Sequence, residues 1–571
     1  MCGIIGINSV KDITVIDAVK ILKKLEYRGY DSFGYSYNNI LHKQIGKIII
    51  PKNNDTTKKI ILHSRWATHG GVTNFNAHPH KSHSENVTIV HNGIISNYKE
   101  LKNELTKKGY EFRSQTDSEV IAHYFEDKLK SMNVNEACVE FIKDIKGEFA
   151  IVMSINNDEN LYALRRDSPL VLGLAPNKNI LASDIYAFSD VTNNAIFFEN
   201  NQFAIIGQDK YEFFDKDGKT IDKEITTFDW QQEESNLDEY EHYMIKEIME
   251  EPAVVKRLLL SLETDQKETF EKFVNLIKTS KKVVFVACGT SYHASLLGVY
   301  YLHKCGVDAQ TIIASEFEHY VGVDSNSLVI PITQSGETMD IIEALKYAKK
   351  SNAKIASIVN VPYSTVQRES ILSLNILAGQ EICVAATKSY VNQVTMMLAL
   401  VKKFGFDVNL DKLPNQISKV LNNIDKIKEI AHSIYQHEHM YVLGRGLSYP
   451  VAREIALKVK EISYIHAEGM MGGELKHGTI ALIEDGTPVI GLLSNGDFDM
   501  QSNLKEVAAR GANVITISNE IKGDIMVKTS NDGKFGILAS VVGQLLTYHL
   551  ALFLERNPDF PRNLAKSVTV K

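Results

Sequence analysis

The sequence predicts a multidomain α/β protein with two doubly wound parallel sheets in its C-terminal half. The first observation is the length of 571 residues, which exceeds one hydrophobic core and indicates three or four domains. The second is the alternation of apolar strand-like runs with helix-like stretches beyond residue 280, a pattern typical of parallel sheets. The third is an internal repeat, because the order of strand, polar loop and helix that begins at residue 283 recurs from residue 440.

The composition is that of an ordinary soluble protein, with 44% hydrophobic and 23% charged residues. A net charge of −7 argues against a nucleic-acid partner. Five cysteines without metal-binding spacing predict free thiols in a reducing cytoplasm. No signal peptide is expected, because Lys11 and Asp12 directly follow the first apolar run. Gln544 and His549 interrupt the apolar run 535–554, which predicts a buried helix and no membrane partner.

The N-terminus carries the first candidate nucleophile. Removal of Met1 would leave Cys2 with both a thiol and a free α-amine. An α-amine has a pKa near 8, so it can accept the thiol proton directly or through one water, as in N-terminal nucleophiles. The apolar run Ile4–Ile7 predicts a buried strand that holds this end in place. A cysteine at this position alone could equally be accidental.

A polar, histidine-rich region follows. Helical spacing over residues 12–25 leads to a turn-like stretch at 28–32, and a β-branched run then enters the polar loop 65–70. The histidine cluster that follows suggests a zinc site, but its spacing matches neither a helix-borne site nor a zinc finger. We therefore expect hydrogen-bonded loop histidines at His78, His80 and His83.

A second strand, Val87–His91, ends at Asn92-Gly93. An asparagine amide and an unobstructed glycine N–H can together hold a developing oxyanion. Asn-Gly is also a hairpin turn signal, and the dipeptide alone favours that turn. A helix is predicted over 97–108, and a polar cap at 114–120 opens another helix. Further strands are predicted over 147–155, 161–166 and 197–207.

Five ordered motifs in this region resemble the class II glutamine amidotransferase domain. They are Cys2-Gly3-Ile4, Arg28-Gly29-Tyr30-Asp31-Ser32, Arg65-Trp66-Ala67-Thr68-His69-Gly70, His91-Asn92-Gly93 and Thr116-Asp117. The resemblance implies that residues 2–228 form an N-terminal-nucleophile hydrolase, an αββα sandwich. It implies that Cys2 attacks the glutamine amide and that Asn92 and Gly93 hold the oxyanion.

The same resemblance assigns the glutamine ligands. It implies that the carboxylate and amine of glutamine are bound by Arg65, Thr68, His69 and Asp117. From the residues alone, Thr116 or Asp117 could instead cap a helix. Arg28 is expected near the glutamine pocket, and Trp66 is a candidate gate of an ammonia channel, although Trp66 could equally be a core aromatic residue.

An acidic linker is predicted over 229–241, followed by the two repeats at 242–410 and 411–560. Pro252 indicates a break or a fresh start in the first helix. Polar loops follow two adjacent strands of the first repeat, where open α/β sheets bind ligands and helix N-termini favour phosphate. The same hydroxyls could simply be helix caps. In the second repeat, Asp497 adds an acid to the corresponding loop, so a structural role is expected there.

Motifs in both repeats and in the tail 561–571 resemble paired sugar-isomerase domains. They are Cys288-Gly289-Thr290-Ser291, Gln334-Ser335-Gly336-Glu337-Thr338, Lys458-Val459-Lys460-Glu461-Ile462, His466-Ala467-Glu468, Gly473-Glu474-Leu475-Lys476-His477-Gly478 and Pro561-Arg562-Asn563-Leu564-Ala565-Lys566-Ser567-Val568-Thr569-Val570. Joined to the glutaminase, they resemble the glucosamine-6-phosphate synthase family over the whole chain. This resemblance implies L-glutamine and fructose 6-phosphate as substrates, an internal ammonia channel and a homodimer or higher homo-oligomer, with no metal or organic cofactor.

The resemblance also implies roles for individual residues. Sugar phosphate would be bound by Thr290, Ser291, Thr333, Gln334, Ser335, Thr338, Val384 and Ala565. His477 suits ring opening because histidine titrates near neutrality, and Glu461 would move the proton between C1 and C2. Lys458 lies three residues from Glu461 on one helix face, a spacing that by itself favours a surface salt bridge. Lys566 would form a Schiff base with the open ketose, whereas a frayed terminus is the alternative for the tail.

Three other functions compete with this one, and the residues argue against two of them. Ala386 stands where the family commonly has serine, which leaves another keto-sugar phosphate as a possible acceptor. A non-catalytic sensor of amino-sugar phosphate predicts the loss of Cys2, Glu461 or Lys566, and all three are present. A phosphoribosyl or asparagine-forming partner domain is disfavoured by the paired sugar-isomerase motifs.

Overall fold

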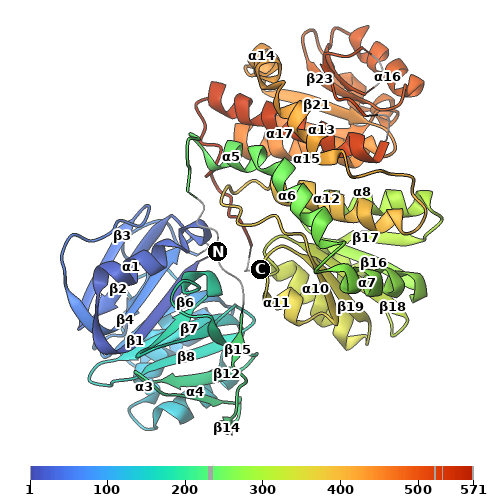
Figure 1. The fold of residues 1–571 in the computed structure, drawn as a ribbon. Helices are drawn as coiled ribbons and strands as arrows, with labels where there is room; N and C mark the ends of the chain where they lie inside the picture. The colour runs from blue at the N-terminus through green and yellow to red at the C-terminus, as the bar shows by residue number, and fades with distance from the viewer. Residues whose placement is uncertain (1, 68, 229–235, 520–521, 530–531, 569–571) are drawn as a thin grey trace. The chain divides into compact units, whose positions relative to one another are not determined.

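The structure is a computed structural model, and it describes residues 2–67, 69–228, 236–519, 522–529 and 532–568. The chain divides into two compact units (Figure 1). Unit 1 comprises Met1–Glu233 with Ser567–Lys571, and unit 2 comprises Glu234–Lys566. Each unit has its own sheets and core.

Unit 1 contains fifteen strands among its described residues. They are β1 (Gly3–Thr14), β2 (Ser32–Tyr37), β3 (Ile40–Ile45), β4 (Thr56–Arg65), β5 (His80–Lys81), β6 (Val87–Ile95), β7 (Gly147–Ile155), β8 (Leu161–Arg166), β9 (Val171–Ala175), β10 (Lys178–Ala182), β11 (Asn194–Phe197), β12 (Gln202–Ile206), β13 (Tyr211–Phe214), β14 (Thr220–Ile221) and β15 (Thr226–Thr227). Its helices are α1 (Val15–Lys23), η1 (Glu26–Arg28), α2 (Tyr98–Lys107), α3 (Glu119–Lys128), α4 (Val134–Asp144) and η2 (Ile185–Ala187).

These strands form two stacked antiparallel sheets. Eight strands follow the order β15-β11-β9-β10-β1-β4-β2-β3, and seven follow the order β14-β13-β12-β8-β7-β6-β5. Ile4 and Ile61 from the first sheet share a buried cluster with Val90 and Val152 from the second. Helix α1 packs on β1 and β4, while α2, α3 and α4 cover the seven-stranded sheet. Helix, sheet, sheet and helix layers confirm the predicted αββα sandwich.

Two elements differ from the prediction. The helix expected from residue 12 begins only at Val15, because β1 continues through Thr14, whose hydroxyl accepts a hydrogen bond from the Asp17 N–H at 3.0 Å. The hairpin interpretation of Asn92-Gly93 is wrong, since β6 runs through both residues and pairs with β7 along its whole length. The pairing of both residues with β7 outweighs the local turn propensity here.

Gly93 is required by the close approach of two backbones. Its φ is +123°, and an added Cβ would lie 2.0 Å from the carbonyl oxygen of Glu148. We expect Gly93→Ala to lower the free energy of unfolding by about 2–5 kcal/mol, because backbone strain and overpacking add. Urea unfolding would measure the loss. Gly71→Ala is the matched control, since a Cβ there meets nothing within 4 Å, and equal losses in the two variants would contradict the prediction.

Unit 2 contains two five-stranded sheets and their helices. The strands are β16 (Lys282–Ala287), β17 (Ala309–Ile313), β18 (Ser327–Thr333), β19 (Lys354–Val359), β20 (Leu372–Asn375), β21 (His439–Gly444), β22 (His466–Met471), β23 (Pro488–Leu493), β24 (Asn513–Ser518) and β25 (Ile525–Met526). The helices are α5 (Tyr243–Met249), α6 (Glu251–Ser261), α7 (Lys267–Thr279), α8 (Gly289–Lys304), η3 (Ala314–Glu316), α9 (Phe317–Tyr320), α10 (Met339–Lys350), α11 (Thr365–Arg368), α12 (Lys388–Lys402), α13 (Leu413–Leu421), α14 (Ile424–Ile434), α15 (Ser448–Ser463), η4 (Glu474–His477), η5 (Thr479–Leu482), α16 (Phe498–Ala508) and α17 (Asp532–Phe553).

The two sheets repeat one topology. Their strand orders are β17-β16-β18-β19-β20 and β22-β21-β23-β24-β25, with all neighbours parallel. In both sheets the second strand of the repeat lies at one edge, and the first, third, fourth and fifth strands follow it across the sheet in sequence order. The shared order confirms the doubly wound repeat. Pro252 lies in the first turn of α6, directly after α5 ends at Met249, so it marks a fresh helix start.

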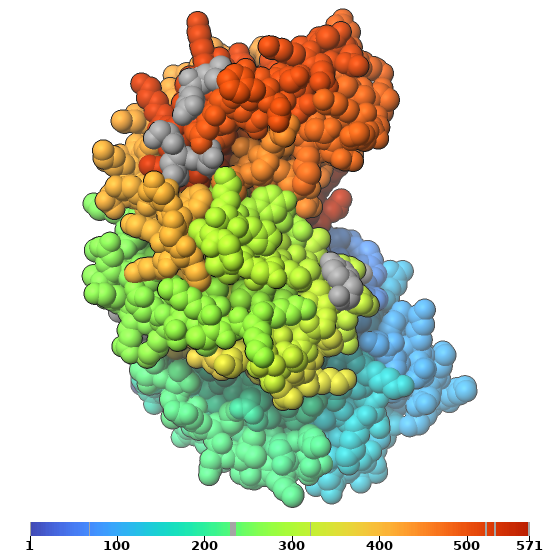
Figure 2. Space-filling model, turned by 90° about the vertical axis from the view of Figure 1, so that its right-hand side faces the viewer, coloured from blue at the N-terminus to red at the C-terminus, as the bar shows by residue number. Residues whose placement is uncertain are grey.

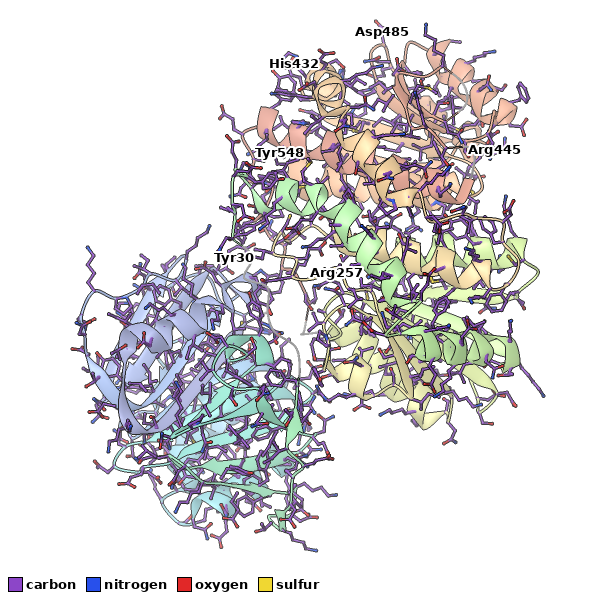
Figure 3. All side chains as sticks on the ribbon, viewed as in Figure 1. Tyr30, Arg257, His432, Arg445, Asp485 and Tyr548 are labelled. Carbon is purple, nitrogen blue, oxygen red and sulfur yellow. The ribbon has the colours of Figure 1, made fainter. Side chains whose placement is uncertain are left out.

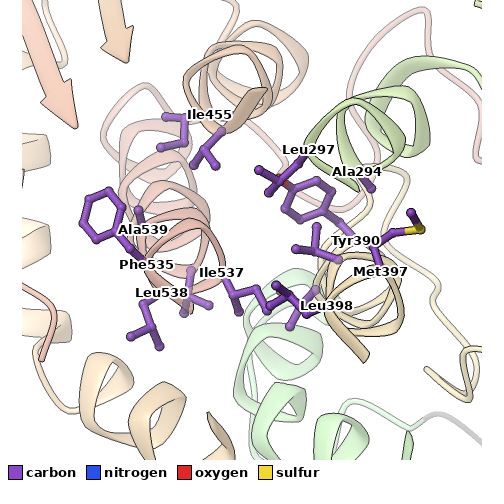
Figure 4. Packing of buried hydrophobic residues seen from close by; sticks show 14 of the residues in the cluster. Ala294, Leu297, Tyr390, Met397, Leu398, Ile455, Phe535, Ile537, Leu538 and Ala539 are labelled. Carbon is purple, nitrogen blue, oxygen red and sulfur yellow. The ribbon is translucent and has the colours of Figure 1, made fainter. Parts of the chain in front are cut away.

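One continuous core joins the two repeats of unit 2. Figure 4 shows buried side chains of α8, α12, α15 and α17 meeting in it. In Figure 2 the green-to-yellow and orange-to-red parts of this unit adjoin along one surface. Helix α17 includes Gly533–Phe553, which is long and apolar enough to cross a membrane, but 94% of its most apolar window is buried. The predicted buried helix is therefore confirmed.

Contacts distant in sequence fasten the ends of unit 2 to this core. The Tyr548 hydroxyl of α17 lies 3.1 Å from Nδ1 of His242, which precedes α5. Arg257 of α6 donates from Nε and Nη2 to the carbonyl of Leu377 at 3.0 and 2.8 Å. Tyr548 and Arg257 are labelled in Figure 3. The helices that begin unit 2 thus pack against both its middle and its last helix.

Candidate active site

Cys2 is held in place by the strands on both sides of β1. The N–H of Gly3 donates to Oγ of Ser64, and that of Ile4 donates to Oγ of Ser183, both at 3.2 Å. Sγ of Cys2 accepts a hydrogen bond from the backbone N–H of Trp66 at 3.2 Å. Burial raises the pKa of the Cys2 thiol, although the Trp66 N–H and the Arg65 charge oppose this. A base is therefore needed to produce the thiolate.

Asn92 lies directly beside Cys2. Its Nδ2 donates to the carbonyl oxygen of Cys2 at 2.9 Å, and the asparagine is 7% exposed. Gly93 follows on β6 with the positive φ already noted. The structure therefore brings together the candidate nucleophile and the candidate oxyanion donor, from strands 90 residues apart in the chain.

Arg65 supports the loop that carries His69, another predicted glutamine ligand. Its guanidinium donates to the carbonyls of His69 and Gly71, the latter at 3.3 Å. Asp117 accepts a hydrogen bond from the N–H of Ile95 at 2.7 Å. Burial lowers the pKa of Arg65, and the negative charge of Asp117 opposes this lowering. Thr68, the fourth predicted ligand, lies outside the described residues.

Sequence reasoning missed a residue that shapes this loop. Asp31 accepts a hydrogen bond from the N–H of Ala67 at 2.8 Å, and its own N–H donates to the carbonyl of Arg65 at 3.0 Å. Its place in the motif Arg28–Ser32 was the one feature of the sequence that could have indicated this role. Two serines that hold β1 in place were missed as well, and nothing local in the sequence distinguishes them.

The two channel candidates differ in their surroundings. Arg28 is 3% exposed and forms an ion pair with Asp184, and its Nε donates to the Tyr27 hydroxyl at 3.1 Å. Trp66 is partly buried, and its backbone contacts the Cys2 thiol. Arg28 thus has a clear structural role, while Trp66 lies against the candidate nucleophile.

Two of the three histidines expected in loops are core residues. The His63 and His78 rings stack at 4.1 Å between centroids, and His78 and His80 meet edge to face at 4.5 Å. His78 and His80 are each 3% exposed and hydrogen-bonded, whereas His83 is exposed. Among the described residues, no group of three or more His, Cys, Asp or Glu side chains is arranged to bind a metal ion.

This histidine cluster predicts acid sensitivity of unit 1. Burial lowers the pKa of His63 to about 3 and also lowers those of His78, His80 and His91. Because each folded pKa lies below the unfolded value near 6.5, their contribution to stability is complete above pH 6.5 and is lost as the pH falls toward 3. We expect the urea concentration at the midpoint of unfolding of unit 1 to fall between pH 6.5 and 5. Tryptophan fluorescence measures this, because both tryptophans precede residue 234, and an unchanged midpoint would contradict it.

The candidate phosphate loops follow neighbouring strands of the first parallel sheet. Strands β16 and β18 pair in parallel, so the loops before α8 and α10 lie at one edge. Neither helix has a side-chain cap, so the hydroxyl of Thr338 at the start of α10 is not used for capping. Other candidates are engaged: Ser291 accepts from Gln393 at 2.9 Å, and Thr333 accepts from the N–H of Gly336 at 3.2 Å. The edge offers hydroxyls and two helix N-termini to an anion.

Lys458 lies in a buried network, so the surface salt-bridge interpretation is wrong. Its side chain is 1% exposed, and Nζ lies 2.5 Å from Glu461 and 3.6 Å from Glu454. Glu454 also accepts hydrogen bonds from Thr290 at 3.1 Å and pairs with Nδ1 of His293 at 2.8 Å. Burial alone would lower the pKa of Lys458, but the two carboxylates outweigh it and raise that pKa.

Lys566 is ordered and paired, so the tail does not fray at this point. Its Nζ donates to Oε2 of Glu381 at 2.5 Å and to the carbonyl of Cys383 at 2.9 Å, and its side chain is 4% exposed. Despite burial, the Lys566 charge lowers the pKa of Glu381 to about 2. Upstream, the Asp559 carboxylate accepts from the N–H groups of Tyr243 and Met244 at 2.9 and 2.8 Å. The start of α5 thereby anchors the tail.

The two buried lysine pairs belong to one neighbourhood. The Cys383 thiol lies within electrostatic range of both Lys458 and Lys566. Val384 donates its N–H to the carbonyl of Asp559 at 3.0 Å, so the predicted sugar contact lies beside the anchored tail. Ala565, the other such contact, immediately precedes Lys566 and is partly buried.

His477 stands apart from these pairs. It ends η4 and is exposed, and within the described part of the chain no hydrogen bond or ion pair joins it to Lys458, Glu461 or Lys566. The structure of this single chain therefore assembles the two lysines with their carboxylates but does not bring the candidate ring-opening residue to them.

Comparisons with known proteins agree with this two-part arrangement. The glutamine amidotransferase domain model matches residues 68–190, and the SIS domain model matches 276–403 and 433–552. A solved structure, the C-terminal domain of glucosamine-fructose-6-phosphate aminotransferase from Francisella tularensis, is 34% identical with a TM-score of 0.54. It covers 57% of this chain and all of its own.

Curated relatives match over their full length. Glutamine–fructose-6-phosphate aminotransferase (isomerising) from Thermococcus kodakarensis is 41% identical over 613 residues, with 100% of both chains covered. The protein of the same name from Sulfurisphaera tokodaii is 38% identical over 594 residues, again with both chains fully covered. The chain belongs to the glutamine–fructose-6-phosphate aminotransferase (isomerising) family.

Proposed function

We propose that this enzyme transfers the amide nitrogen of L-glutamine to fructose 6-phosphate and isomerises the product to glucosamine 6-phosphate, releasing glutamate. One observation carries the proposal. A single chain holds a cysteine beside an amide donor in unit 1. In unit 2 it holds two lysine–glutamate pairs, each with a buried lysine, near a loop edge of the kind that binds phosphate. The first set suits amide hydrolysis, and the second suits imine and proton-transfer chemistry.

The glutaminase half uses Cys2 as nucleophile. The thiolate attacks the side-chain carbonyl carbon of glutamine, and the free α-amine takes the thiol proton once Met1 is removed. Asn92 and the N–H of Gly93 stabilise the tetrahedral oxyanion. Its collapse expels ammonia and leaves a thioester, which water then hydrolyses to glutamate. Arg65, Thr68, His69 and Asp117 would hold the two ends of glutamine in place.

The sugar half uses the two lysine pairs. The six hydroxyl and amide residues assigned above from Thr290 to Thr338, with Val384 and Ala565, would bind the phosphorylated sugar while His477 opens its ring. The Lys566 amine adds to the C2 carbonyl, water leaves, and an imine results. Ammonia then replaces Lys566 at C2. Glu461 removes the proton from C1 and returns it to C2, which converts the ketose imine to the amino-aldose. Lys458 fixes the position of the Glu461 carboxylate through their 2.5 Å contact.

Several features of the working enzyme belong to the same proposal. We propose that ammonia passes internally between the two sites, with Trp66 as a gate and Arg28 nearby. We also propose a cytoplasmic homodimer or higher homo-oligomer that needs no cofactor, nucleic acid or membrane. A second chain would offer its own exposed His477 to the sugar site, which would account for the separation of this residue in one chain.

A nitrogen-labelling assay tests the function. Purified protein is incubated with ¹⁵N-amide glutamine and fructose 6-phosphate. The ¹⁵N content of the hexosamine 6-phosphate is measured by mass spectrometry and compared with that from a Cys2→Ala control. Labelled product from the parent, and none from the control without added ammonia, supports the whole scheme. Glutamate release without labelled hexosamine would refute fructose 6-phosphate as the acceptor.

A second acceptor has one observation in its favour. Ala386 lacks the hydroxyl common in the family and lies between Val384 and the start of α12 at Lys388, in the segment that carries Glu381. One hydrogen bond to the sugar or phosphate would be absent. An assay across several ketose phosphates, each compared by kcat/KM, distinguishes this alternative, which requires another ketose to be preferred.

A further inference from the structure

His63 occupies a fully buried position on β4, beside the candidate oxyanion donor Asn92. The register of the sheet places it opposite Ile4 of β1, and its side chain is 0% exposed. Its Nε2 lies 3.1 Å from two atoms of β6, the carbonyl oxygen of His91 and Oδ1 of Asn92. No role in the proposed reaction has been assigned to this residue.

The tautomer of His63 follows from its partners. The His91 carbonyl oxygen can only accept a hydrogen bond, so Nε2 of His63 carries the hydrogen. The other ring nitrogen, Nδ1, is buried and has no hydrogen-bond partner among the described residues. With the hydrogen on Nε2, Nδ1 carries only a lone pair, so no N–H donor of the ring is buried without a partner. The imidazole is therefore a fixed donor aimed at β6.

This donor also fixes the orientation of the Asn92 amide. With Nε2–H of His63 at 3.1 Å, the facing atom of Asn92 must be the acceptor Oδ1, so the amide nitrogen turns toward Cys2. In the flipped orientation, the amide NH₂ would face the Nε2–H, and Oδ1 would face the Cys2 carbonyl oxygen. Two donors would then meet at one end and two acceptors at the other. The two orientations have nearly the same shape, so packing alone does not choose between them.

We propose that His63 is a positioning residue of the oxyanion site, whose Nε2–H keeps the Asn92 amide nitrogen turned toward the glutamine carbonyl. The inference rests on the proposed glutamine hydrolysis at Cys2. A flipped Asn92 would present an acceptor to the negative charge that develops in the transition state. Losing one oxyanion donor costs roughly 10²–10³-fold in kcat, and this sets the upper limit for any effect of His63 that acts through Asn92.

The test is a double-mutant cycle on glutamine hydrolysis. His63→Leu is expected to lower kcat about tenfold or more, up to that limit, with little change in KM. His63→Gln, which returns an N–H donor at a similar reach, is expected to restore most of the rate. In an Asn92→Ala background, His63→Leu should cause no further loss, because the residue it positions is gone. Losses that multiply in the double variant would overturn the proposal.

Two controls separate positioning from general damage. The rate of Cys2 alkylation by iodoacetamide does not depend on an oxyanion donor and should be unchanged in His63→Leu. An alkylation rate that falls by the same factor as kcat would show that His63 acts on the thiol or the fold and would overturn the proposal. Ammonia-driven hexosamine synthesis should also be unchanged.

If His63→Leu does not fold, His63→Gln and His63→Asn decide the question. Both are polar, but the asparagine amide is one methylene too short to reach Asn92, so only the glutamine variant should keep its rate. Equal rates in the two would overturn the proposal. A parent enzyme that hydrolyses glutamine, with His63 variants that do so equally fast, would defeat this inference alone. A parent that releases no glutamate would instead defeat the proposed function.

Discussion

Lys566→Arg is expected to abolish hexosamine synthesis while leaving the fold intact. Arginine keeps a positive charge near Glu381, whose carboxylate pairs with the Lys566 ammonium at 2.5 Å. Its guanidinium stays protonated and cannot form an imine. Loss of a covalent nucleophile can cost as much as about 10⁶-fold, so we expect at least about a 10³-fold drop in kcat. The measurement is synthesis from fructose 6-phosphate with either glutamine or added ammonia.

A neutral variant separates the chemistry of Lys566 from its structural pairing. Lys566→Met should be equally inactive, but it leaves the fully buried Glu381 without its counter-charge. Breaking a buried ion pair costs about 3–5 kcal/mol, so this variant should unfold at lower urea concentration than Lys566→Arg. Borohydride trapping with fructose 6-phosphate should label the parent tail and neither variant. Synthesis by Lys566→Arg within tenfold of the parent would show that no imine forms at this lysine.

Elements with a strong local pattern were predictable from the sequence. The strand 147–155 coincides with β7, and the helix 97–108 contains α2 with one residue to spare at each end. The strand is a run of apolar residues, and the helix has apolar residues at helical spacing. In both elements these residues face the core, so the local pattern agrees with the tertiary packing. Asn92-Gly93 is the contrary case, because a turn signal lies within a strand that is paired over its whole length.

The partners of the site residues could not be predicted, because they are distant in the chain. Glu381 lies 185 residues before Lys566, and His293 lies 161 residues before Glu454. Arg28 shows the same limit, since its ion-pair partner Asp184 is 156 residues away. A sequence pattern reports spacing along one element, whereas these pairs depend on how the sheets and the tail come together. The spacing of Lys458 and Glu461 could be read from the sequence, but the burial of Lys458 could not.

Glu461→Gln is the second variant with a large expected effect, and it tests proton transfer apart from imine formation. Glutamine keeps the shape of the side chain and an oxygen for Lys458, which also retains Glu454 at 3.6 Å. The folded state should therefore persist. The amide cannot accept the C1 proton, and general-base losses are about 10²–10⁴-fold. We expect the rate of hexosamine synthesis to fall by this factor. The rate at which the C1 hydrogen exchanges with D₂O should fall with it.

Trapping at Lys566 distinguishes Glu461 as a base from Glu461 as a support. If Glu461 only moves the proton, borohydride should still trap fructose 6-phosphate on Lys566 in Glu461→Gln, because imine formation precedes that step. Glu484→Gln is the matched control, since Glu484 is an exposed glutamate of the same unit, and it should behave as the parent. Loss of trapping in a folded Glu461→Gln protein would mean that the Lys458–Glu461 pair serves imine formation instead. The two lysine pairs would then act in one step rather than in succession.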